Sequence, residues 1–72
     1  MNGDTLYALR DALDLREADF AALLGLTGSS AAQTLHDMEK GRKPISGPLK
    51  ELIPRIASEH GLTLISDQWI SK

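Results

Sequence analysis

The chain of 72 residues has no cysteine, only three aromatic side chains and no long apolar run. Without cysteine there is no disulfide, no thiolate metal ligand and no cysteine nucleophile. Spanning a bilayer takes about 20 consecutive apolar residues, and residues 1–4 lack the basic side chains with which a signal peptide begins. We therefore expect one small, cytoplasmic domain with no membrane partner.

The net charge is also small, at −2, with an isoelectric point near 5.5. Proteins that bind nucleic acid are usually basic, so the total charge disfavours that class. The positive charge is nevertheless concentrated, because residues 29–55 hold five basic and three acidic side chains, whereas residues 1–28 hold two basic and five acidic ones. A polyanionic partner is therefore expected to meet the middle of the chain.

The spacing of apolar residues predicts four helices, over about residues 5–13, 17–24, 30–40 and 47–60. Gly25, Gly41 and Gly61 follow the second, third and fourth of them, where glycine commonly ends a helix. Pro54 lies inside the fourth helix and is expected to kink or break it, because proline donates no backbone hydrogen bond. The predicted fold class is all-α, with four or five helices.

The residues after Gly61 have a different pattern. The segment 62–65 is short, apolar and partly β-branched, which is typical of a strand. Because a single strand has no partner inside a helical domain, we expect it to pair with a second copy of the chain or to lie over the core. Residues 1–61 are accordingly predicted as the helical domain and residues 62–72 as a dimerisation element, with contacts through Leu62, Leu64, Ile65, Trp69 and Ile70.

The predicted helices 17–24 and 30–40 are joined by a turn that contains Gly25 and Gly28. The outer side of the second helix carries small and polar residues, and this arrangement is typical of a helix-turn-helix. The major groove of DNA is about 12 Å wide and admits one helix, whose N-terminal side chains then reach the base edges. The pattern therefore favours double-stranded DNA as the partner.

The sequence resembles the lambda repressor-like (Xre/Cro type) helix-turn-helix family over roughly residues 5–57. The resemblance is carried by Leu9 and Arg10, by residues 15–25 and by residues 38–44. It implies a helix-turn-helix domain with a recognition helix at about residues 30–40. The distance from Gly25 to Gly41 is longer than the family usually has, so either the turn is longer or the recognition helix starts earlier.

Site residues follow from the same resemblance. It implies base contacts by Ser29, Ser30, Gln33, Thr34 and Asp37, and phosphate contacts by Arg16, Lys40, Arg42 and Lys43, with His36 in either set. It also implies an ion pair between Arg10 and Glu39 that holds the first helix against the third. Glu17 stands where relatives often carry glutamine, and its carboxylate is expected to repel a phosphate unless it faces Arg16.

The expected function is a sequence-specific transcriptional repressor that binds a palindromic operator as a homodimer, of an autoregulatory, phage or anti-CRISPR-associated kind. Two alternatives stay open. One is a protein-interaction module that keeps the fold without DNA, and the other is an antitoxin whose residues 62–72 wrap a toxin. No nucleophile turn, phosphate loop or carboxylate pair is present, and the two histidines are 24 residues apart, so we expect no enzyme, no metal and no cofactor.

Overall fold

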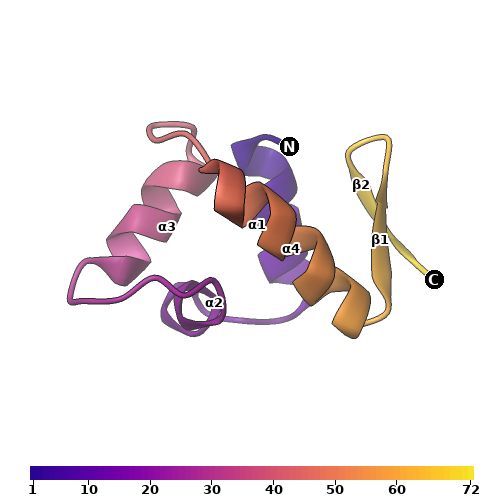
Figure 1. Ribbon diagram of the computed structural model, residues 1–72, viewed down its shortest axis with the longest axis horizontal. Helices are drawn as coiled ribbons and strands as arrows, with labels where there is room; N and C mark the ends of the chain where they lie inside the picture. The colour runs from indigo at the N-terminus through magenta and orange to yellow at the C-terminus, as the bar shows by residue number, and fades with distance from the viewer.

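The chain folds into four helices followed by one antiparallel hairpin, and this computed structural model describes all of residues 1–72 (Figure 1). The elements are α1 (Gly3–Ala12), α2 (Glu17–Leu23), α3 (Ala31–Glu39), α4 (Gly47–Glu59), β1 (Leu62–Ile65) and β2 (Gln68–Ser71). The four predicted helices are present close to their expected bounds, and the predicted strand at 62–65 is present as β1, whereas β2 was not predicted. None of the helices combines the length and the apolarity that a membrane crossing requires.

Local backbone chemistry sets the ends of the helices. Asn2 precedes α1, and its side-chain oxygen accepts a hydrogen bond of 2.9 Å from the backbone N–H of Thr5. Gly25 and Gly41 follow α2 and α3 with φ angles of 77° and 79°, a left-handed conformation that glycine adopts without a steric cost. Pro48 lies in the first turn of α4, where its missing N–H leaves no intrahelical bond unmade.

The predicted break at Pro54 is wrong, because α4 continues through it. Pro54 is exposed, whereas Ile53, Ile56 and Ala57 of the same helix are buried. An interior proline costs a helix about 3 kcal/mol or more, and each fully buried isoleucine side chain contributes roughly 1.5–3 kcal/mol. Packing of the apolar face therefore keeps the helix continuous where local propensity alone would end it.

The core lies between the four helices and consists of a single cluster of 11 buried hydrophobic residues. Every helix contributes to it, and Ile45 adds a side chain from the loop between α3 and α4. The largest fully buried side chains are Phe20, Leu6, Leu9, Leu35 and Ile53. Because α1, α2 and α3 share this core, the side of α3 that carries Leu35 faces inward and its polar side faces out.

The strand expected to lack a partner pairs within its own chain, so the prediction of a lone strand is wrong. β1 and β2 are antiparallel, with Leu64 opposite Trp69. The turn between them is formed by Ser66 and Asp67, whose φ angles of 52° and 60° suit a two-residue hairpin. Sequence reasoning missed this turn because glycine or asparagine, which adopt such angles most readily, is absent from it.

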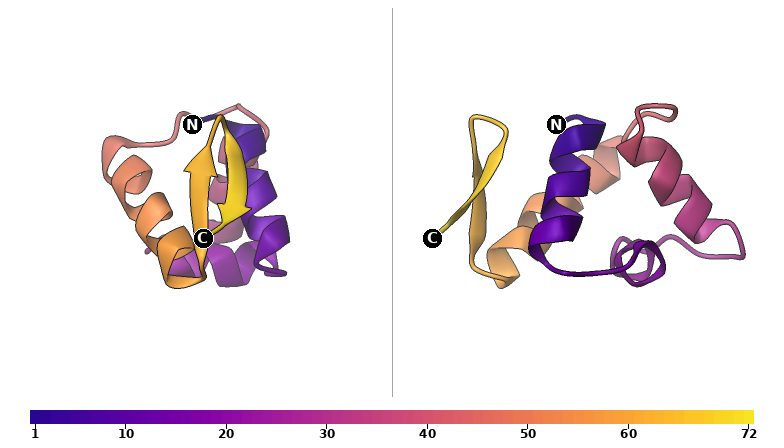
Figure 2. Two further views of the ribbon diagram at one scale, coloured as in Figure 1. Left: turned by 90° about the vertical axis from the view of Figure 1, so that its right-hand side faces the viewer. Right: turned by 180° about the vertical axis from the view of Figure 1, so that it is seen from behind.

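The hairpin packs on its own domain, with β1 beside α4 and β2 beside α1 (Figure 2). Leu62 and Trp69 contact the core, and the indole N–H of Trp69 donates a hydrogen bond of 2.8 Å to the backbone carbonyl of Thr5. The large apolar side chains that the hairpin leaves to solvent are Ile65, 56% exposed, and Ile70, 42% exposed. Of the five predicted dimer contacts, only these two remain freely accessible.

Candidate nucleic-acid interface

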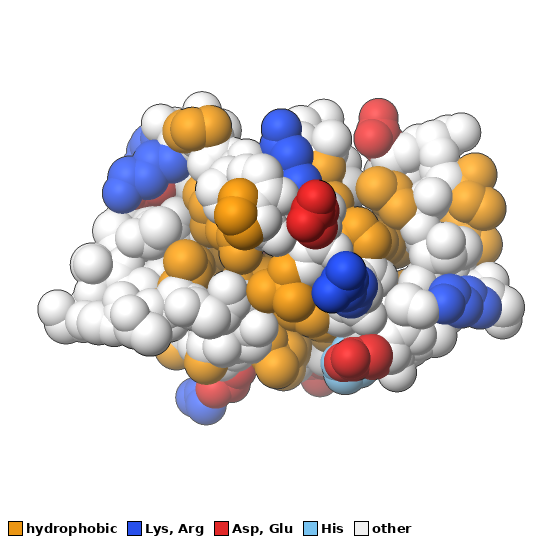
Figure 3. Space-filling view, in the orientation of Figure 1, with side chains coloured by type: hydrophobic (Ala, Val, Ile, Leu, Met, Phe, Trp, Pro, Cys, Tyr) orange, Lys and Arg blue, Asp and Glu red, His pale blue; other side chains and the backbone are white.

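The polar side of α3 lies at one end of the molecule, and the hairpin lies at the other (Figure 1). Ser29, Ser30 and Gln33 are exposed, and Thr34 is half-buried, whereas Leu35 belongs to the core. In Figure 3 the surface over the start of α3 and the loop before it is formed mostly by uncharged polar side chains and backbone. This surface, residues 29–34, is open to a partner.

The turn before α3 accounts for the unusual spacing between Gly25 and Gly41. α2 ends at Leu23 and α3 begins at Ala31, so the additional residues lie in a longer turn rather than in an earlier helix start. Gly28 has a φ of 90° and its carbonyl accepts a hydrogen bond from the backbone N–H of Ala31. Ser29 and Ser30 are therefore turn residues just before the helix, and the hydroxyl of Ser30 makes no capping bond.

Asp37 interacts with two residues that were predicted to contact DNA, Gln33 and Arg42. Its Oδ1 accepts a hydrogen bond of 3.0 Å from Nε2 of Gln33 and lies 3.8 Å from Nη1 of Arg42. Its backbone carbonyl also accepts the N–H of Arg42 at 2.8 Å, and its side chain is only 18% exposed. The carboxylate of Asp37 thus orients the side chains of Gln33 and Arg42. Because it is engaged by these two residues and little exposed, it is a poor candidate for the predicted base contact. The Oε1 of Gln33 takes part in no hydrogen bond and is available as an acceptor.

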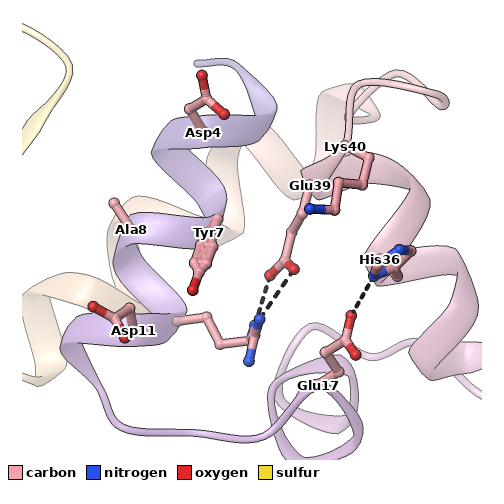
Figure 4. A pocket seen from close by; sticks show the side chains of 9 residues that line it. Asp4, Tyr7, Ala8, Asp11, Glu17, His36, Glu39 and Lys40 are labelled. Atoms are coloured by element: carbon pink, nitrogen blue, oxygen red, sulfur yellow. Dashed lines mark hydrogen bonds and ion pairs between the residues drawn. The ribbon is translucent and has the colours of Figure 1, made fainter.

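The basic residues predicted to contact phosphate lie in three places. Arg42 and Lys43 are exposed in the loop after α3, and Lys43 forms no ion pair. Arg16 precedes α2 and pairs with Asp19 at 3.2 Å, a contact between exposed side chains. Such exposed pairs contribute about 0–1 kcal/mol, so a phosphate can replace the carboxylate at little cost. Lys40 lies apart from the others, over the groove between α1 and α3 (Figure 4).

Glu17 faces His36 and not Arg16. The Oε2 of Glu17 lies 2.9 Å from Nδ1 of His36, and both side chains are about one-third exposed, at 36% and 37%. Figure 4 shows the two side chains pointing toward each other from α2 and α3. Sequence reasoning missed this contact because it depends on how the two helices cross. The carboxylate that was expected to repel phosphate is therefore turned toward an imidazole, and the His36 side chain is directed toward α2.

The ion pair implied by the resemblance is present between Arg10 and Glu39. Nε of Arg10 lies 2.7 Å from Oε2 of Glu39, and Nη1 donates a hydrogen bond of 3.1 Å to the carbonyl of Leu15. The guanidinium also lies 5.2 Å from the ring centre of Tyr7. The hydrogen bond to Glu39, which outweighs the opposing effect of burial, raises the pKa of Arg10 above its usual value. The pair thus ties α1 and the loop after it to the last turn of α3.

An acidic groove of about 710 Å³ lies between α1, α2 and α3. Figure 4 shows Asp4, Asp11 and Glu39 around it, together with Glu17 and His36. No group of three or more histidine, cysteine or acidic side chains is arranged to hold a metal ion. Its four carboxylates outnumber its two cations, Arg10 and Lys40, so the net charge of the groove is negative and unfavourable for a polyanion.

The comparisons with known proteins add no relative: the chain matches no protein-family model, no curated protein and no solved structure.

Proposed function

We propose that the protein is a cytoplasmic, sequence-specific DNA-binding repressor of the lambda repressor-like helix-turn-helix type, which places α3 in the major groove. One observation carries the proposal: the side of α3 and of the preceding turn that bears Ser29, Ser30 and Gln33 is exposed at one end of the molecule. The basic loop after α3 is linked to this side through Asp37, which contacts both Gln33 and Arg42. A groove about 12 Å wide admits a helix presented in this way.

In this proposal, α3 contacts the base edges and the basic loop after α3 contacts the phosphates. Arg42 and Lys43 are free to contact phosphates, which fix the orientation of the helix without reading sequence. Gln33 is the strongest candidate for a base contact, because the residue is exposed and its Oε1 forms no hydrogen bond, while its Nε2 is bound to Asp37. An acceptor in the major groove selects a base that offers a donor there, which is adenine N6 or cytosine N4.

The proposal is tested by selecting binding sites from random duplexes and then measuring fluorescence anisotropy at several salt concentrations. We expect one enriched sequence, and a logarithm of the affinity that falls linearly with the logarithm of salt concentration, since cations condensed on the DNA are released when the protein binds. No binding even at low salt would contradict the proposal. It would instead support a protein-interaction module or an antitoxin, the alternative that the net charge of −2 and the exposed Ile65 and Ile70 favour.

Replacing Gln33 with alanine is expected to weaken binding to the selected duplex by about 1–2 kcal/mol, toward the lower end of the range for a base contact. Binding to a scrambled duplex should stay nearly unchanged, because phosphate contacts carry no sequence information. Anisotropy titrations with both duplexes measure the difference. Gln68→Ala, on the hairpin at the far end of the molecule, is the matched control and should change neither. Equal loss on both duplexes by Gln33→Ala would remove this residue as a reader of sequence.

The double substitution Arg42→Ala with Lys43→Ala is expected to weaken binding to every duplex. If each residue contacts one phosphate, the slope of log affinity against log salt becomes shallower by about two. The control is Arg55→Ala with Lys72→Ala, which changes the net charge equally but removes no residue of the loop after α3. An equal change of slope in both double variants would mean that net charge, and not the position of these side chains, decides the effect.

A homodimer remains part of the proposal, because one helix in one groove reads few base pairs and two copies on a two-fold axis read two half-sites. The structure constrains how the copies meet. The hairpin and α3 lie at opposite ends of a molecule 34 Å long (Figure 1). Two copies joined through Ile65 and Ile70 would present α3 in opposite directions and so bind two separate duplex segments. A dimer on one palindrome needs a contact nearer to α3.

Light scattering on the protein and on Ile65→Ser with Ile70→Ser distinguishes the arrangements. Loss of the dimer in the double variant would place the contact on the hairpin, and a dimer that persists would place it elsewhere. A monomer at every concentration would contradict the homodimer.

A further inference from the structure

A second groove lies near the end of α3 and shares no lining residue with the acidic one. It has a volume of about 470 Å³ and is bordered by the start of α1, the loop after α3 and the first turn of α4. Its basic residues are Arg42, Lys43 and Lys50, and no acidic side chain lines it. In Figure 3, basic side chains lie along the upper edge of the molecule, over this loop and the start of α4.

Lys50 is the residue of this groove that sequence reasoning did not select. It is the fourth residue of α4, its side chain is exposed, and it forms no ion pair. Its neighbour Glu51 is also exposed but does not line the groove. Successive residues of a helix point about 100° apart, which separates the two charges. Lys50 and Lys43 therefore present unneutralised positive charge to the same hollow.

We propose that this basic groove binds the sugar-phosphate backbone of the duplex beyond the reach of α3, with Lys50 as a phosphate contact. The inference rests on the proposed function and extends it. Arg42 and Lys43 border both the groove and the end that carries α3, so a strand that reaches this loop leads into the groove. Each strand of a duplex offers a phosphate about every 3.4 Å along the helix axis, which brings further phosphates within range of Lys50.

The chemistry of the groove fits a polyanion better than a small free anion. It is open, and its charges are flexible, exposed side chains, with no buried polar donor aimed into it. Binding a polyanion through such groups gains free energy by releasing condensed counterions, a gain that a single phosphate ion does not provide.

The test is Lys50→Gln in the full chain, titrated against the selected duplex at several salt concentrations. The slope of log affinity against log salt should become shallower by about one, and affinity for selected and scrambled duplexes should fall by the same factor. Arg55→Gln is the matched control on the same helix, because Arg55 is exposed and does not line the groove. For Arg55→Gln, the slope of log affinity against log salt should stay close to that of the unmodified protein.

Each outcome decides the inference. Suppose that the unmodified protein binds DNA with a steep slope of log affinity against log salt. If Lys50→Gln changes this slope no more than Arg55→Gln does, the groove is not a phosphate contact, and the proposed function still stands. If the unmodified protein binds no DNA, the proposed function and the inference both fail. Inorganic phosphate, added at constant ionic strength, should cause no saturable NMR shift at Lys43 or Lys50. Saturable shifts would assign the groove to a free anion instead.

Discussion

Replacing Gly3 with alanine is expected to destabilise the fold by about 3 kcal/mol, at the upper end of what overpacking usually costs. A Cβ at this position would clash with the backbone carbonyl oxygens of Glu39 and Met38. Both are backbone atoms, so no side chain can rotate away, and α1 must separate from the last turn of α3. In an exposed helix the same substitution would instead stabilise, because alanine favours helix by about 1 kcal/mol relative to glycine.

Thermal unfolding followed by circular dichroism measures this effect. For a domain of this size about 1 kcal/mol corresponds to roughly 4–8 °C in Tm, so Gly3→Ala should lower Tm by more than about 10 °C. Gly47→Ala is the matched control, since Gly47 is likewise the first residue of a helix and a Cβ there meets no atom within 4 Å. The control should be neutral or slightly stabilising, and similar Tm changes in both variants would contradict the close contact between α1 and α3.

Replacing Glu39 with alanine is expected to lower the free energy of unfolding by about 2–4 kcal/mol. Removal of one partner of a buried ion pair typically costs about 3–5 kcal/mol, because the other charge is left unpaired. The Glu39 side chain is only 4% exposed, whereas that of Arg10 is 20% exposed and keeps its hydrogen bond to Leu15. Partial access to water therefore reduces the loss below the upper end of that range.

Urea unfolding gives the magnitude, and a double-mutant cycle with Arg10→Ala isolates the coupling between the two side chains. Glu51→Ala, which removes an exposed carboxylate that forms no ion pair, is the control and should change stability by less than about 0.5 kcal/mol. An unchanged free energy of unfolding for Glu39→Ala would show that the pair does not hold α1 against α3. A coupling near zero would attribute any loss to the packing of Glu39 itself.

The two variants test the same junction in different ways. Gly3 lets the backbone of α1 approach the end of α3, and the pair of Arg10 and Glu39 joins the two helices further along α1. The orientation of α3, and with it the exposure of Gln33, depends on this junction. We therefore expect either variant to lower Tm as well as to weaken DNA binding, whereas Gln33→Ala, at an exposed position, should weaken binding and leave Tm nearly unchanged.

Much of the candidate interface could be predicted from the sequence, because it depends on the pattern along one helix. Gln33 and Leu35 lie on opposite sides of α3, as the periodicity indicates. The partners of the charged side chains could not be predicted in the same way. Glu17 and His36 meet only because α2 and α3 cross, and the role of Asp37 changes from a base contact to a support for Gln33 and Arg42. Lys40 and Lys43, three residues apart, border grooves of opposite charge.

By itself the sequence determined where the four helices end to within one residue, because apolar periodicity and glycines act over a few neighbouring residues, although α1 begins at Gly3, two residues before its predicted start. Only the tertiary structure decided whether α4 continues through Pro54, where residues 62–71 find a strand partner, and which cations remain unpaired. These outcomes depend on contacts between residues that are distant along the chain. Burial of Ile53 and Ile56 outweighs the local cost of Pro54, and the bond from Trp69 to Thr5 joins residues 64 positions apart.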